Sequence, residues 1–154
     1  METKFSIAKD VTMSEEQLAD LLSMASDYSV GFDYWAHYDN LNMNGNNGYR
    51  NYRAARASLE AEGIDSEKIC LEQVWARMLF TGKSLYLLEA EGDADERSCW
   101  YEITLENIIK GIKMYFEGEY SDNIVSFEDL INNGDGEDAD TVFQLAVYGK
   151  VVFG

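Results

Sequence analysis

One predicted strand carries the residues of this chain that are best suited to chemistry. Between residues 29 and 39 the sequence alternates, which places Asp33, Trp35, His37 and Asp39 on one face. His37 is the only histidine, and carboxylates at i−4 and i+2 would raise its pKa, so it could act as a base or help to bind a metal. The same pattern is typical of an exposed strand face or of a binding surface. The opposite face would carry Val30, Phe32, Tyr34, Ala36 and Tyr38.

This face does not by itself define a reaction. One histidine between two aspartates is a weak metal site, and the sequence contains no HxxxH, HExxH or Cys/His spacing. No recognisable nucleophile accompanies the histidine. We therefore expect no catalytic residues, no metal and no cofactor.

A stripe of arginines at i, i+3 and i+6 follows on a short helix that we expect to run to about Glu62. Arginines on one helix face could grip phosphates, and Tyr49 or Tyr52 could stack on a base. Such arginines could equally pair with surrounding carboxylates. The Asn-Gly-rich stretch before the helix predicts a loop, without a Walker or Rossmann glycine pattern. The alternative ligand-binding site consists of Trp35, His37, Arg50, Arg53 and Arg56.

Charge is the strongest compositional signal. The chain has 29 Asp and Glu against 12 Lys and Arg, a formal net charge of −17. Such a protein repels nucleic acid and favours a basic partner, such as the groove of a DNA- or RNA-binding protein, although acidity can also serve solubility alone. The expected partner-binding carboxylates are Glu89, Glu91, Asp93, Asp95, Glu96, Glu117, Glu119, Asp122, Asp135, Glu137, Asp138 and Asp140. The last four of these residues resemble a calcium-binding loop. However, no alignment with such a loop places a glycine at its sixth position together with a glutamate at its twelfth.

The stretch 71–116 has the clearest periodicity and should position these groups. Apolar residues at helical spacing predict helices over 71–79 and 105–116, and alternating residues predict a hairpin of strands 84–89 and 99–104 between them. Gly82 should end the first helix, and Thr104 should cap the second. Gly111 inside the second helix suggests close packing against a neighbour.

Weaker signals describe the two ends of the chain. We expect a strand over 4–9, then a helix with two possible capping boxes, Thr12 with Glu15 and Ser14 with Gln17. A short helix around 127–131 and a last helix that Gly149 ends should follow, with a final strand over 151–153. Cys70 and Cys99 have no CxxC partner and are expected to be buried reduced thiols.

Together these elements predict a single α+β domain over residues 1–154. Its antiparallel sheet would have about four strands, from the N-terminal strand, the Phe32 strand and the hairpin, with helices chiefly on one face. No apolar run reaches the length of a membrane span, and the N-terminus does not resemble a signal peptide. Strand order and oligomeric state are not predicted.

Two stretches resemble a known group of proteins. Residues 30–36, VGFDYWA, resemble a YWA-type strand, and residues 137–154 resemble a DAxxAD…QxAxxGxVxxG ending. Both are features of small acidic proteins encoded by phages and prophages of gram-positive bacteria, and the likeness extends over nearly the whole chain beyond Asp10. The chain departs from this family at Phe32-Asp33 and in an Asn-rich insertion after Asp39. The resemblance implies a phage or mobile-element protein in the cytoplasm of a bacterial host, and it carries over no site residues.

In that setting, the charge predicts a non-enzymatic accessory protein. We expect an acidic DNA mimic that inhibits a host DNA-binding defence nuclease, of the anti-CRISPR or anti-restriction type. The alternative is a small-ligand-binding protein that sequesters a signalling nucleotide.

Overall fold

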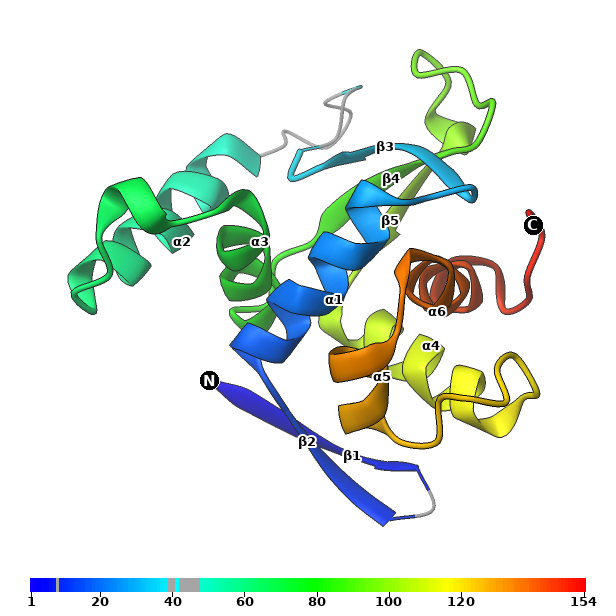
Figure 1. The fold of residues 1–154 in the computed structure, drawn as a ribbon. Coiled ribbons are helices and arrows are strands. Elements are labelled where there is room, and N and C mark those ends of the chain that lie inside the picture. Colours follow the sequence, from blue (N-terminus) through cyan, green and yellow to red (C-terminus); the bar gives the residue numbers. More distant parts are fainter. Residues whose placement is uncertain (8, 39–40, 42–47) are drawn as a thin grey trace.

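The computed structural model describes the chain except for residues 8, 39–40 and 42–47, and Asp39 therefore lies outside the described residues. It has the predicted α+β architecture, with two small antiparallel sheets and helices packed around them (Figure 1). Two 3-10 turns, η1 (Ser66–Lys68) and η2 (Arg97–Cys99), lie in the connections. The strands are β1 (Glu2–Ile7), β2 (Lys9–Ser14), β3 (Phe32–Ala36), β4 (Leu85–Glu89) and β5 (Trp100–Ile103). The helices are α1 (Glu15–Asp27), α2 (Gly48–Ala61), α3 (Leu71–Phe80), α4 (Leu105–Glu117), α5 (Phe127–Asn133) and α6 (Gly136–Tyr148).

The central stretch folds as predicted. α3 and α4 flank the antiparallel β4–β5 pair, whose register matches Leu85 with Ile103. Thr104 caps α4, since its hydroxyl accepts a hydrogen bond from the Asn107 amide. At Gly111 an added Cβ would lie 2.5 Å from the carbonyl oxygen of Val142. The glycine therefore permits the close packing of α4 on α6 that the sequence suggested.

The N-terminal strand is not part of the main sheet. β1 pairs with β2 as a separate hairpin, and the main sheet has three strands in the order β3-β4-β5. The predicted four-strand sheet is therefore divided into two. The position of the N-cap explains part of this difference between prediction and structure. Of the two predicted capping boxes, Ser14 with Gln17 begins α1, and Thr12 lies within β2.

A bulge interrupts β3, so the predicted alternation of its two faces is wrong. The register shifts between Phe32 and Tyr34, and an extra residue in a strand turns the following side chains to the other face. Phe32 and Trp35 consequently both belong to the main core, and Trp35 is only 9% exposed. Asp33 remains exposed.

The helices lie chiefly on one face of the three-stranded sheet, as predicted. Leu85, Leu87 and Ile103 point into the main core, which they share with α1, α3, α4 and α6. On the opposite face Leu88 and Trp100 form a small second cluster with residues of the β4–β5 connection. The end of the acidic hairpin therefore packs on its own sheet.

Two further predictions need correction. Residues 151–153 form no strand; their backbone is instead bound by the Gln144 side chain, whose oxygen accepts hydrogen bonds of 2.8 Å from the amides of Val152 and Phe153. Cys70 and Cys99 are free thiols, but Cys70 is exposed and Cys99 is half-buried. Among the described helices, none combines the length and apolar character that crossing a membrane requires.

Candidate functional site

Local hydrogen bonds hold the β4–β5 connection in place. The Asp33 carboxylate accepts a 2.7 Å hydrogen bond from the Glu91 amide, and the Asp93 carboxylate accepts one of 2.9 Å from the Asp95 amide. Trp100 donates from its indole nitrogen to the carbonyl oxygen of Ala94 at 2.9 Å. The acidic residues here are therefore presented by an ordered segment. We call this set the hairpin surface: Glu89, Glu91, Asp93, Asp95 and Glu96.

Backbone geometry singles out one member of this surface. Glu91 has a φ of 61° and is the only described non-glycine residue with positive φ. This left-handed conformation brings Cβ close to the following carbonyl oxygen and costs about 1–2 kcal/mol in a non-glycine residue. The Asp33 carboxylate, which binds the Glu91 amide, helps to hold this turn.

The other predicted acidic runs lie at the ends of two helices, the end of α4 and the start of α6. The loop after α4 and the start of α6 enclose a polar hollow of about 290 Å³, lined by Asp135, Glu137 and Asp138 with Tyr120 and Asn123. Asp135 caps α6, accepting from the Asp138 amide at 3.0 Å, which is a structural role for an acid at a helix start. We call this set the helix-end surface: Glu117, Glu119, Asp122, Asp135, Glu137 and Asp138.

One residue of the helix-end surface also has a buried partner. The Asp138 carboxylate accepts a 2.9 Å hydrogen bond from the Tyr115 hydroxyl. Burial, followed by this hydrogen bond, holds the pKa of Tyr115 well above its usual range. Asp138 thus joins the hollow to the core of the α4–α6 pair.

Asp140 does not belong to either surface. It is 2% exposed, and its carboxylate accepts hydrogen bonds from the Ser29 hydroxyl at 2.8 Å, the Gly31 amide at 3.3 Å and the Gln144 side-chain amide at 2.8 Å. The prediction that Asp140 contacts a partner is therefore wrong. Ser29 and Gly31 lie more than a hundred residues away in the sequence, so Asp140 ties the segment before β3 to α6.

The two acidic surfaces are separate. In Figure 1 the hairpin end lies beyond β3, and the loop after α4 lies at the far side of α6. The ion pairs found among the described residues use the carboxylates of Glu15, Glu60 and Glu62. Neither acidic surface takes part in them, so no ion pair among the described residues neutralises its carboxylates.

The His37 side chain is enclosed by aromatic rings. Its ring stacks on Tyr52 with 4.4 Å between centroids, and its Nδ1 accepts a 3.3 Å hydrogen bond from the indole nitrogen of Trp75. Burial lowers the pKa of His37, which is the opposite of the predicted direction. Asp33 is turned to Glu91 instead, so the described residues do not form the predicted strand-face site.

The alternative ligand-binding residues are only partly brought together. Arg50 and Arg53 are exposed on α2, near the tyrosines that contact His37. Arg56 instead pairs with Glu60 at 3.4 Å and donates to the carbonyl oxygen of Ser66 at 2.8 Å. Trp35 lies in the core. This arrangement supports a nucleotide site less than the sequence did.

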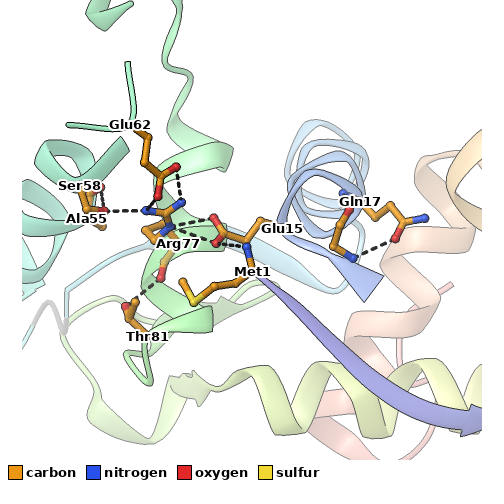
Figure 2. A network of polar contacts seen from close by, with 9 residues as sticks. Met1, Glu15, Gln17, Ala55, Ser58, Glu62, Arg77 and Thr81 are labelled. Carbon is orange, nitrogen blue, oxygen red and sulfur yellow. Dashed lines mark hydrogen bonds and ion pairs between the residues drawn. The ribbon is translucent and has the colours of Figure 1, made fainter. Parts of the chain in front are cut away.

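The structure adds a buried ionic centre that we did not predict. Figure 2 shows the Arg77 guanidinium between two carboxylates: its Nε lies 2.8 Å from Glu15, and its Nη1 lies 2.9 Å from Glu62. Arg77 is 7% exposed and also donates to the Ser58 hydroxyl at 2.9 Å. The Glu15 carboxylate contacts the Met1 amino group as well, at 3.1 Å. We call Arg77, Glu15, Glu62 and Ser58 the Arg77 cluster.

Three members of the Arg77 cluster, Glu15, Glu62 and Arg77, line a cleft of about 350 Å³ between α1, α2 and α3. The hydrogen bond from Arg77 lowers the pKa of Glu62, and the hydrogen bonds that Arg77 donates to Glu62 and Glu15 raise the pKa of Arg77. Because each charge has a partner, the cluster has the features of a structural centre that joins three helices. Its sequence signal is poor, since Glu15 and Arg77 lie 62 residues apart.

Neither a metal-binding group nor a similar protein helps to define the site. Within the part of the chain that the structure describes, no three His, Cys, Asp or Glu side chains are grouped to hold a metal ion. A scan with protein-family models gave no match, and neither the curated proteins nor the solved structures that were compared include one similar to this chain.

Proposed function

We propose that this protein is a non-enzymatic binding protein whose carboxylates occupy the basic groove of a DNA- or RNA-binding protein. In this role it would be a DNA mimic, with carboxylates in place of phosphates. The resemblance to phage proteins suggests the finer proposal that the partner is a host defence nuclease, of the CRISPR or restriction type, which the protein inhibits in the bacterial cytoplasm.

One observation carries the proposal: the hairpin surface presents exposed carboxylates that take part in none of the ion pairs found among the described residues. Glu91, Asp93, Asp95 and Glu96 are exposed, and none of them takes part in the ion pairs of the described chain. Hydrogen bonds to Asp33 and Trp100 fix the segment that carries them. Because the backbone of this segment is held, its ordering costs little conformational entropy when a partner binds, which favours affinity.

The physical basis is charge complementarity. Lys and Arg side chains that normally bind phosphates can pair with carboxylates in the same way. Such contacts are screened by salt, so they steer association at low ionic strength and weaken as salt rises. We expect nanomolar affinity for the partner, with a loss of about tenfold or more between about 50 and 200 mM salt.

An affinity pulldown from a gram-positive bacterial lysate at low and high salt tests this proposal. We expect one DNA-binding protein or ribonucleoprotein to be retained at low salt and released at high salt. The captured partner should also lose DNA binding when the acidic protein is added. A partner that resists high salt, or that binds DNA and the acidic protein together, would contradict the mimic.

Matched variants then locate the contact. The first replaces Glu91, Asp95 and Glu96 with Gln, Asn and Gln; the second replaces the exposed residues Glu2, Glu67 and Glu106 with Gln. Both variants lose three negative charges, so a general charge effect would weaken them equally. We expect the hairpin variant to lose far more affinity than the control, and equal losses would rule out the hairpin surface.

A further inference from the structure

The start of α2 is attached to the rest of the fold through the ring of His37, which follows directly after β3. The ring stacks on Tyr52 of α2, with 4.4 Å between centroids and 25° between ring planes. Its Nδ1 accepts the 3.3 Å hydrogen bond from the indole nitrogen of Trp75 in α3. One side chain therefore connects the end of β3 with α2 and α3.

Two further tyrosines complete the surroundings of this ring. Tyr38 and Tyr49 each meet the His37 ring edge to face, at 5.3 Å and 5.2 Å between centroids, and they stack on each other at 4.7 Å. Gly48 begins α2 beside the His37 backbone, where an added Cβ would collide with the His37 carbonyl oxygen. We call the five side chains the His37 cluster: His37, Tyr38, Tyr49, Tyr52 and Trp75.

The hydrogen bonds of this cluster suit only a neutral imidazole. The indole N–H of Trp75 is a donor, so Nδ1 of His37 must be unprotonated and Nε2 must carry the proton. Nε2 is buried and has no hydrogen-bond partner among the described residues. A second proton would sit on Nδ1 and point at the Trp75 donor, so neither nitrogen of the cation would have an acceptor. Buried donors without acceptors are unfavourable, so the cluster disfavours the cation.

Within the described part of the chain, no opposite charge is paired with this ring. The groups that face it are Tyr38 from its own segment, Tyr49 and Tyr52 from α2, and Trp75 from α3. The ion pairs found among the described residues do not include His37. Tyrosine rings can attract a cation, but burial lowers the pKa of His37, and the neutral ring is favoured.

The charged residues of the three elements offer this ring no anionic partner in the described structure. The first turns of α2 carry Arg50 and Arg53, which would repel a cation, and the other two charges of that helix pair with each other. β3 carries Asp33, whose carboxylate binds the hairpin backbone. α3 carries Arg77, which is held in its own cluster, and Glu72, which forms none of the ion pairs found.

The far end of α2 is held in a different way. Arg77 donates a 2.9 Å hydrogen bond to the Ser58 hydroxyl and lies 2.9 Å from Glu62, just after the helix. The pKa of Glu62 is lowered below its ordinary value of 4.5, so this attachment persists in mild acid. The two ends of α2 therefore depend on two different titratable groups.

We propose that His37 makes the attachment of α2 sensitive to acid: protonation of its ring releases the start of the helix from β3 and α3, while the Arg77 cluster keeps the far end in place. This inference does not depend on the proposed function. The folded pKa of His37 lies below the ordinary value of 6.5, so the folded state binds this proton less readily than the unfolded state. The attachment therefore contributes its full stability above about pH 6.5 and loses it as the pH falls further.

Native-state hydrogen exchange of the full-length protein, followed by NMR and corrected for the intrinsic dependence of exchange on pH, tests this proposal. We expect the protection of amides 52–55 to fall by about fivefold or more between about pH 7.5 and about pH 5.5, where carboxylates stay ionised. Amides 58–61 should change by less than about twofold, because Arg77 still holds that end. The ring nitrogen signals of His37 should show the Nε2–H tautomer at the higher pH and a titration midpoint below 6.5.

Three substitutions test the chemistry of the ring. His37→Phe keeps an aromatic ring that cannot be protonated, so the protection of amides 52–55 should no longer depend on pH. Trp75→Phe removes the donor that faces Nδ1, so the pKa of His37 should rise toward 6.5 and the loss of protection in acid should shrink. Trp100→Phe is the matched control, because its indole nitrogen binds Ala94 in the second cluster, and it should leave the His37 midpoint unchanged. If His37→Phe does not fold, the parent protein and the two tryptophan variants decide.

Four results would overturn the inference. The first is a His37 midpoint at or above 6.5. The second is protection of amides 52–55 that stays constant over this pH range, and the third is a loss of protection that persists unchanged in His37→Phe. The fourth is an equal shift of the His37 midpoint in Trp75→Phe and Trp100→Phe.

Discussion

The Arg77 cluster and the hairpin surface are both rich in carboxylates, but they differ in what surrounds those groups. In the cluster, Glu15 and Glu62 share a guanidinium that is 7% exposed. On the hairpin surface Glu91 and Asp95 face solvent outside the ion pairs of the described chain. The fold therefore places a scarce cation where a buried carboxylate needs one, and leaves its surface unbalanced. Carboxylate charge serves stability in the first region, and under the proposed function it serves recognition in the second.

We expect the largest loss of stability from a substitution in the Arg77 cluster. Arg77→Ala leaves the half-buried Glu15 carboxylate without its guanidinium partner, and we expect a loss of about 3 kcal/mol in the free energy of unfolding. Urea denaturation measures it. The hairpin variant with Glu91, Asp95 and Glu96 neutralised should stay within about 0.5 kcal/mol of the parent. Similar losses in both variants would remove the distinction between the two regions.

A second prediction sharpens the contrast within a single helix. Glu137 and Asp140 lie three residues apart on α6, but Glu137 is exposed and Asp140 is buried. Asp140→Ala leaves three donors without their acceptor and should cost about 2 kcal/mol in thermal or urea unfolding. Glu137→Ala should change stability by less than about 0.5 kcal/mol. A neutral Asp140→Ala would show that its bonds are replaced by water.

The third prediction concerns how the stabilising contribution of Glu62 depends on pH. Arg77 lowers the pKa of Glu62 below its ordinary value of 4.5, so the folded state binds this proton less readily than the unfolded state. The contribution of Glu62 is therefore present above about pH 4.5 and is lost as pH falls through the lowered pKa. Glu62→Gln should have a lower free energy of unfolding than the parent near neutral pH, and this difference should become smaller in acid. A difference that stays constant down to low pH would contradict this linkage.

The smallest expected effect concerns the end of α1. Asp27→Asn removes a negative charge from the end of the helix where the dipole disfavours it, and should raise stability by about 0.3–1 kcal/mol at low salt. Differential scanning calorimetry at low and high salt measures the gain, which salt should reduce. A destabilised variant would mean that Asp27 has a structural role after all.

Local signals predicted most of the fold. α3, the β4–β5 hairpin and α4 follow from apolar periodicity and from caps such as Thr104, which act over a few residues. The hairpin of β1 and β2 escaped prediction because Thr12 competes as a cap. The bulge beside Asp33 depends on pairing with β4, which no local pattern contains.

The candidate site was predicted less completely, for a related reason. Exposure of the hairpin acids follows from their place at a turn. The burial of Asp140 depends on Ser29 and Gly31, and that of Arg77 on Glu15, all distant in sequence. A carboxylate in a run of carboxylates gives no sign of such a partner, so composition suggested partner binding for Asp140 as well.

The left-handed backbone of Glu91 has a consequence for selection experiments. Glycine or asparagine adopts that conformation more easily, so a library screened for thermal stability alone should replace the glutamate with one of them. A library screened for capture of the partner should keep an acid at the same position. The two enriched sequences would diverge at this one turn, and their divergence would measure how strongly recognition, rather than folding, determines the residue there.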